Sequence, residues 1–358
     1  MLGRSKRQIA LQHHRHLPLT VTLRPTGIVV PVDERPGRRS CTGHRCERFL
    51  SLLPESENIG SMAQLGRGLT VDGGCQVAGR RVAYCLYGPA SARSVVFQYG
   101  TPGSRRLSSQ LVAAAVRADV RLLVVERPGY GTSARRSGRR IIDIVEDIAA
   151  AVDAVGWSEF AVWGGSGGAP HALACAAALP QRVTACASVV GPAPFDAPGL
   201  DWFADMSPGN IEEFMLAARG EQAYRPLVER LAREAVTAIA CGGIQVASHY
   251  ELADSDIHAL QARRSEAGYL ERMRTTYTGG VDGWIDDCIA MTQPWGFDLE
   301  TITAPTSVWY GPSDVLSPRA HTEHLLEAIP HAARHELSGG HVLSDIDLDE
   351  IYNSLNDT

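Results

Sequence analysis

The chain has 358 residues, of which 44% are hydrophobic, and it carries a net charge of −6 at neutral pH. This length accommodates one large domain with an insertion, and the hydrophobic content is ordinary for a globular protein. The acidic balance argues against a nucleic acid as partner. Because the sequence has no run of 18 apolar residues, a transmembrane helix is not expected.

Residues 1–61 are rich in arginine, proline and polar residues and show no sustained hydrophobic period. This composition predicts a disordered or weakly ordered N-terminal extension. Met62 opens a segment typical of a domain start, which leads to the hypothesis that translation begins there. The N-terminus lacks the continuous apolar stretch of a signal peptide, and the eight cysteines are scattered, so we expect free thiols and a cytoplasmic location.

From residue 69 onward, short apolar segments alternate with helical ones. Strands are expected near 80–87, 94–99, 120–126, 160–163, 183–190, 306–310 and 333–337. Helices are expected near 105–118, 141–155, 167–179, 318–329 and 346–356. This alternation predicts an α/β fold with a mostly parallel sheet flanked by helices. Between residues 192 and 297 the alternation stops, and four helical stretches follow one another at 210–219, 222–240, 250–274 and 281–292.

The run Gly164-Gly165-Ser166-Gly167-Gly168 connects the strand near 160–163 to the helix that follows it. A strand, a sharp turn and a helix place Ser166 at the apex in a strained conformation, where Cβ atoms on neighbouring residues would clash with the adjoining strand or helix. The hydroxyl then lies at a helix N-terminus, where backbone N–H groups can bind an anion. The pattern predicts a serine nucleophile, against the alternative of a glycine-rich turn without chemistry.

A serine presented in this way is expected to be followed by an acid and then by a histidine. His341 follows a short strand and the run Ser338-Gly339-Gly340, whose flexibility lets a loop bring the imidazole over the strand ends, so His341 is expected to be the general base. Asp314 follows the strand near 306–310 and is expected to orient that imidazole, although an Asx turn or a helix cap would also explain it. Asp196 is the rival acid.

The strand near 94–99 opens into the loop Tyr99-Gly100-Thr101-Pro102-Gly103. An oxyanion hole needs two backbone N–H groups, one from the residue after the nucleophile and one from the loop after an early strand. Gly167 and Thr101 hold these two positions. Two glycines and a proline give the loop a rigid and unusual course, so the expected supporting residues are Tyr99, Gly100, Pro102 and Gly103. An ordinary turn is the alternative.

Five motifs occur in this order between residues 80 and 343: Gly100–Gly103, Glu126–Ser133, Gly164–Gly168, Gly311–Asp314 and Gly339–His341. Together they make the chain similar to α/β-hydrolase-fold serine hydrolases. The resemblance is to the capped branch that contains proline-iminopeptidase-like peptidases and esterases. The chain departs from that family at Tyr99, where a histidine usually supports the oxyanion loop, and at Glu126, where an aspartate is more usual.

The resemblance implies that the consecutive helices form a cap, which excludes water from an acyl pocket and supplies substrate contacts. The predicted organisation is an N-terminal extension at 1–61, an α/β-hydrolase core formed by 62–191 and 298–358, and a helical cap at 192–297. No metal or organic cofactor is expected. The pair His321 and His324 lacks the further ligands of a metal site, and His171 is expected to pack its helix.

The candidate triad and the resemblance predict a serine hydrolase that cleaves a small ester or amide through an acyl-enzyme, with carboxylesterase activity as the first expectation. A proline-iminopeptidase-like aminopeptidase needs a carboxylate for the substrate's amino group, and the candidates for it are Glu212, Glu213 and Glu251. Acyl transfer to another acceptor would use the same triad. Outside the enzyme class, the alternative is a non-catalytic ligand-binding protein on the same fold. The expected partner is a small-molecule ester or amide.

Overall fold

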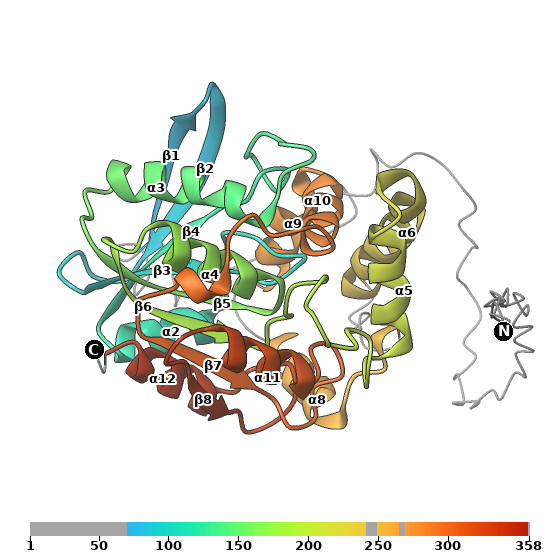
Figure 1. Ribbon diagram of the computed structural model, residues 1–358. Coiled ribbons are helices and arrows are strands. Elements are labelled where there is room, and N and C mark those ends of the chain that lie inside the picture. The colour runs from blue at the N-terminus through green and yellow to red at the C-terminus, as the bar shows by residue number, and fades with distance from the viewer. Residues whose placement is uncertain (1–69, 241–248, 265–268, 357–358) are drawn as a thin grey trace, which may run out of the picture. The chain divides into compact units, whose positions relative to one another are not determined.

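A computed structural model describes residues 70–240, 249–264 and 269–356. The predicted extension 1–61 and the hypothesised start at Met62 therefore lie outside the described residues. An eight-stranded sheet forms the centre of the described chain, in the order β1-β2-β4-β3-β5-β6-β7-β8 (Figure 1). The strands are Thr70–Val77 (β1), Arg80–Tyr87 (β2), Arg93–Gln98 (β3), Val120–Val125 (β4), Phe160–Gly165 (β5), Val183–Val189 (β6), Thr306–Tyr310 (β7) and Ala333–Glu336 (β8). Strand β2 runs antiparallel to β1 and β4, and the other neighbouring pairs are parallel.

Strand β1 is the element that the sequence pattern did not predict. Its residues include Asp72, Gly73 and Gly74, which are weak strand formers, and it lies at the sheet edge with most of its side chains exposed. The two-residue turn to β2 is formed by Ala78 and Gly79, with φ angles of 47° and 78°. Two-residue β-hairpin turns need this left-handed backbone, so the turn favours antiparallel pairing of β1 with β2.

Helices cover both faces of the sheet (Figure 1). On one face, α2 (Ser109–Arg117) packs against α12 (Asp345–Ser354); on the other, α3 (Ile144–Ala154) packs against α4 (Ala169–Ala178). Helix α11 (Arg319–Ala328) packs against β7. The 3₁₀ helices of the described residues, η3 (Ile141–Asp143), η4 (Ser166–Gly168) and η5 (Leu299–Thr301), contact α4. The mostly parallel sheet flanked by helices confirms the predicted α/β class.

Between β6 and β7 the described residues form five helices, which we call the inserted helices: α5 (Pro208–Ala217), α6 (Glu221–Ala240), α8 (Asp254–Arg264), α9 (Tyr269–Thr278) and α10 (Asp282–Met291). The helical stretch predicted at 250–274 contains α8 and the first part of α9, and residues 265–268 between them lie outside the described residues. Across the parts of the chain that the structure describes, no helix is long and apolar enough to cross a membrane. The boundaries of core and cap stay a prediction.

The strand register brings the candidate site residues to one edge of the sheet. Gln98 at the end of β3 pairs with Gly164 in β5, and Gly165 pairs with Val189 in β6. On the other side of β6, Tyr310 at the end of β7 pairs with Glu336 at the end of β8. The loops that follow these parallel strands therefore emerge side by side, where open α/β sheets bind their ligands.

Candidate active site

Ser166 lies at a sharp turn between β5 and α4. Its φ angle is +54°, in the left-handed region that residues other than glycine rarely adopt. Glycines permit the close approaches around it. A Cβ on Gly164 would collide with the carbonyl oxygen of Gly168, and a Cβ on Gly168 would collide with the carbonyl oxygens of Gln98 and Tyr99. The serine is thus held in a strained conformation between the sheet and the start of a helix.

Asp314 and His341 come from the loops after β7 and β8. His341 Nδ1 lies 2.8 Å from Asp314 Oδ2. The other carboxylate oxygen, Oδ1, accepts hydrogen bonds from the N–H groups of Leu316 at 2.8 Å and Ser317 at 3.0 Å. Asp314 therefore makes an Asx turn and contacts the imidazole at the same time, so the two interpretations of this residue are compatible.

The charge around His341 favours its protonated form. Burial lowers the pKa of the imidazole, but the charge of Asp314 and the hydrogen bond to it act in the opposite direction. The charge of Asp256 adds to them, and the pKa of His341 is raised above its ordinary value. His341 is therefore a stronger base than an unperturbed histidine, which suits it to take a proton from a hydroxyl group.

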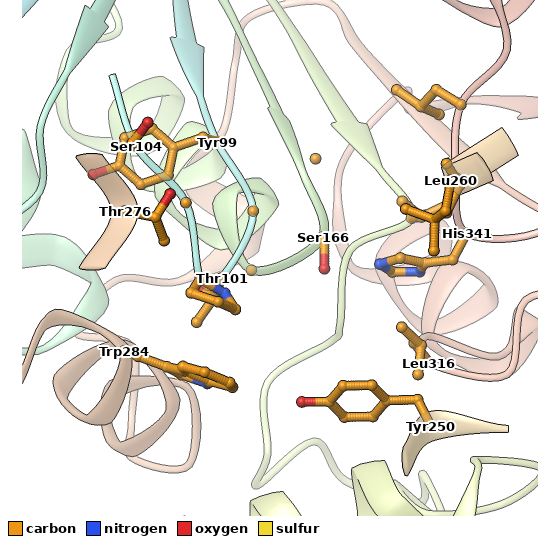
Figure 2. Close-up of a pocket in the computed structure, with 18 of the residues that line it drawn as sticks. Tyr99, Thr101, Ser104, Ser166, Tyr250, Leu260, Thr276, Trp284, Leu316 and His341 are labelled. Atoms are coloured by element: carbon orange, nitrogen blue, oxygen red, sulfur yellow. The ribbon is translucent and has the colours of Figure 1, made fainter. Parts of the chain in front are cut away.

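Ser166, His341, Thr101 and Gly167 line one cavity with a volume of about 390 Å³. Figure 2 shows the imidazole of His341 on one side of Ser166 and Thr101 on the other. Gly100 lies directly against the serine, because a Cβ at this glycine would be 3.3 Å from the Cβ of Ser166. The volume lies in the range of small-molecule sites.

Tyr99 stands where the related family usually has a histidine, and it holds the loop through Arg127. The Tyr99 hydroxyl accepts a hydrogen bond from the N–H of Arg127 at 2.7 Å, and the guanidinium stacks on the tyrosine ring with its carbon 4.0 Å from the ring centroid. The guanidinium also donates to the carbonyl oxygens of Tyr99 at 2.6 Å and Gly100 at 3.1 Å. The loop backbone is therefore anchored by a buried arginine.

Asp287, on α10, compensates the charge of that arginine. Its Oδ2 lies 2.6 Å from Arg127 Nη2 and accepts hydrogen bonds from Tyr130 Oη at 2.9 Å and from Thr101 Oγ1 at 2.8 Å. Its Oδ1 accepts a very short hydrogen bond from Arg139. Burial raises the pKa of Asp287, but the charges of the two arginines outweigh burial and hold the pKa well below its usual range. An inserted helix is thus bonded directly to the loop beside Ser166.

A protein-family model, that of the alpha/beta hydrolase fold, matches residues 93–347. The chain belongs to the alpha/beta hydrolase fold family. The resemblance seen in the sequence motifs is confirmed at this level. Among curated proteins, no sequence matches the chain.

Solved structures similar to this alpha/beta hydrolase share its fold at low sequence identity. An enol-lactonase from Burkholderia xenovorans is 19% identical, with a TM-score of 0.56, over 80% of this chain and 98% of its own. An esterase from a Rhodococcus species is 16% identical, with a TM-score of 0.58, over 80% of this chain and 98% of its own. A bromoperoxidase from Bacillus anthracis is 18% identical, with a TM-score of 0.60, over 80% of this chain and the whole of its own (100%).

Glu213, on α5, is a buried carboxylate in the cavity wall of this alpha/beta hydrolase, with 4% of its surface exposed. Its oxygens accept hydrogen bonds from Tyr250 Oη at 2.6 Å and Trp284 Nε1 at 2.7 Å, and a very short one from Tyr224. These donors are neutral. Of the three carboxylates proposed for an amino group, Glu213 alone is buried, whereas Glu212 and Glu251 are exposed.

The rival candidates lie elsewhere in the described chain. Asp196 is exposed, and the partner of His341 is Asp314. His171 is buried beside Asp287, with Nε2 3.8 Å from its Oδ1, and His321 Nδ1 accepts the N–H of Ala193 at 3.1 Å. Burial lowers the pKa of both imidazoles to about 4. Among the described residues no group of histidine, cysteine and acidic side chains is arranged to hold a metal ion.

Arg127 and Asp287 are the residues that the sequence interpretation did not assign to the site. Arg127 belongs to the motif Glu126–Ser133, which was used only for the family resemblance. Asp287 belongs to the helical stretch predicted at 281–292, for which the sequence indicated no site residue. The sequence signal that could have identified Asp287 is its position in the apolar helical segment Trp284–Met291. A carboxylate on a buried helix needs a cationic partner.

Proposed function

We propose that this protein is a serine hydrolase that cleaves a small carboxylic ester or amide through an acyl-enzyme. The observation that carries the proposal is the 2.8 Å contact between His341 Nδ1 and Asp314 Oδ2 at a cavity that Ser166 also lines. A carboxylate on Nδ1 leaves Nε2 as the ring atom that can take a proton from the serine hydroxyl. Membership of the alpha/beta hydrolase fold family supports the same class of reaction.

In the proposed reaction Ser166 Oγ attacks the carbonyl carbon of the substrate while His341 Nε2 accepts the hydroxyl proton. Asp314 stabilises the imidazolium, and the backbone N–H groups of Thr101 and Gly167 bind the negative carbonyl oxygen. The leaving alcohol or amine then takes the proton from His341. A water molecule, deprotonated by His341, attacks the acyl-enzyme and releases the acid. The loop residues Tyr99, Gly100, Pro102 and Gly103 hold the Thr101 N–H in place.

We assign the cap to residues 192–297 and the core to residues 62–191 and 298–358. Tyr250 and Trp284, from the inserted segment, line the same cavity as Ser166 (Figure 2). A wall made by inserted helices excludes water from the acyl group and strengthens the electrostatic interactions at the oxyanion.

Glu213 favours a second candidate function, the hydrolysis of substrates that carry a free amino group, as in a proline-iminopeptidase-like aminopeptidase. The side chain is buried at the cavity wall, where Tyr250 and Trp284 donate hydrogen bonds to it, so its carboxyl oxygens are the acidic acceptor that a substrate ammonium group would meet there. Glu213→Gln is expected to raise KM for aminoacyl amides by roughly 10- to 100-fold and to leave neutral esters unchanged. Glu212→Gln, an exposed neighbour, is the control. Equal effects on both substrate types would reject this candidate.

Labelling with a fluorophosphonate probe, measured by intact mass, tests the proposed function. We expect one adduct on the wild type, none on Ser166→Ala, and strongly slowed labelling of His341→Ala. Ser158→Ala and His258→Ala, at exposed positions, are the matched controls and should label like the wild type. Labelling would then justify a screen of neutral esters and aminoacyl amides, with added alcohols to detect acyl transfer. Absence of an adduct on folded wild type would reject the hydrolase and favour a non-catalytic binding protein.

A further inference from the structure

Helix α8, one of the inserted helices, contacts the loops that carry both His341 and Asp314. Asp256 Oδ1 accepts the N–H of Val342 at 2.8 Å, and Arg263 donates to the carbonyl oxygen of Leu343 at 2.6 Å. Ser255 Oγ lies 3.4 Å from Ser313 Oγ, next to Asp314 in the chain. Leu260 of the same helix lines the cavity with His341 (Figure 2). Helix α8 therefore contacts both the loop that carries His341 and the loop that carries Asp314.

Asp256 is the charged residue at the centre of these contacts. The residue is fully buried, and its second oxygen, Oδ2, has no partner of hydrogen-bond geometry in the described chain. A Cβ on Gly340 would lie 2.5 Å from this oxygen, so the residue before His341 has to be a glycine for the carboxylate to fit. A buried carboxylate with one free oxygen is costly, and an asparagine or serine could accept the same backbone hydrogen bond without the charge.

The charge of Asp256 acts on His341. The charges that raise the pKa of the imidazole are those of Asp314, from the loop after β7, and Asp256, from α8. Both favour the imidazolium, which forms when a serine gives up its proton. Burial raises the pKa of Asp256 itself, and the N–H groups of Val342 and His341 counteract that effect.

We propose that Asp256 is a positioning residue for His341. It fixes the backbone of residues 340–342 and adds a second negative charge near the imidazole, so the base is in position only when α8 is docked on the loop. This inference rests on the proposed function, in which His341 is the general base. It links the inserted helices to the activity of the base itself, in addition to any contact they make with a substrate.

The test is the pH dependence of fluorophosphonate labelling in Asp256→Asn and Asp256→Ala. For Asp256→Asn we expect the rate at the pH plateau to fall about 10-fold and the acidic limb to move to lower pH, because the charge that stabilises the imidazolium is lost. For Asp256→Ala, which also loses the acceptor for Val342, we expect a fall of about 100-fold. Asp254→Asn, an exposed acid in the first turn of the same helix, should match the wild type.

A purely structural Asp256 would behave differently. It would change the urea midpoint of unfolding and leave the acidic limb where it is, and that result overturns the inference. If Asp256→Ala does not fold, Asp256→Asn decides, because its amide oxygen can still accept the N–H of Val342. His341→Ala separates the two levels: rapid labelling of His341→Ala rejects the proposed function, whereas slow labelling of His341→Ala with wild-type behaviour of Asp256→Asn rejects this inference alone.

Discussion

Replacing Asp287 with asparagine tests whether the buried ion network holds the loop beside Ser166. The side chains of Asp287 and Arg127 are 0% exposed and that of Arg139 is 1% exposed, so the substitution leaves two buried guanidinium groups without their counter-charge. Removing one partner of a buried ion pair costs about 3–5 kcal/mol. Because two cations depend on Asp287, we expect the free energy of unfolding to fall by an amount at the upper end of this range. That is a large part of the roughly 5–15 kcal/mol by which domains are stable.

Urea unfolding followed by circular dichroism measures this loss. The control is Asp282→Asn on the same helix, whose side chain is 34% exposed and pairs with Arg225 at 2.6 Å. Ion pairs that remain partly exposed to solvent contribute about 1 kcal/mol or less, so this variant should unfold close to the wild type. Fluorophosphonate labelling should be slowed in Asp287→Asn, because Thr101 and Arg127 lose their anchor, and not in Asp282→Asn. A loss of less than about 1 kcal/mol in Asp287→Asn, with unchanged labelling, would refute the reasoning.

Three further predictions follow from the same contacts. Asp314→Asn should slow labelling on the order of 10³-fold and move its acidic limb to lower pH, because the carboxylate that raises the pKa of His341 is lost; an unchanged limb in a pH–rate profile would contradict this role. The folded-state pKa of Asp287 is depressed, so its stabilisation is complete above the unfolded value of about 3.9 and is lost as the pH falls through the folded value. Asp287→Asn should therefore lose less stability than the wild type between neutral pH and about pH 3, as urea midpoints at the two pH values would reveal. Gly168→Ala should lower the free energy of unfolding by about 1–3 kcal/mol, because its Cβ meets the carbonyl oxygens of Gln98 and Tyr99. Gly165→Ala, with a nearest contact of 3.9 Å, should unfold like the wild type, and equal urea midpoints for the two variants would disprove the steric account.

Local sequence was enough to predict the serine turn and the class of the sheet. The glycines around Ser166 are demanded by contacts between residues a few positions apart or on adjacent strands, and such contacts follow from strand and helix geometry. Alternating apolar strands and helices likewise determine a mostly parallel sheet. Strand β1 escaped prediction because an exposed edge strand that contains two glycines lacks the apolar pattern by which strands are found.

The tertiary structure decided the contacts that surround these motifs. The sequence placed Asp314 and His341 in loops, whereas their 2.8 Å contact depends on the register of β7 and β8. The acidic partner of Arg127 could not be predicted, since Asp287 comes from an inserted helix far along the chain. A hydrophobic period indicates that one face of a helix is buried, but it does not indicate which part of the protein that face packs against. The inserted helices bring Glu213, Asp256 and Asp287 to the site. The roles of these residues therefore depend on how the helices pack in the folded protein.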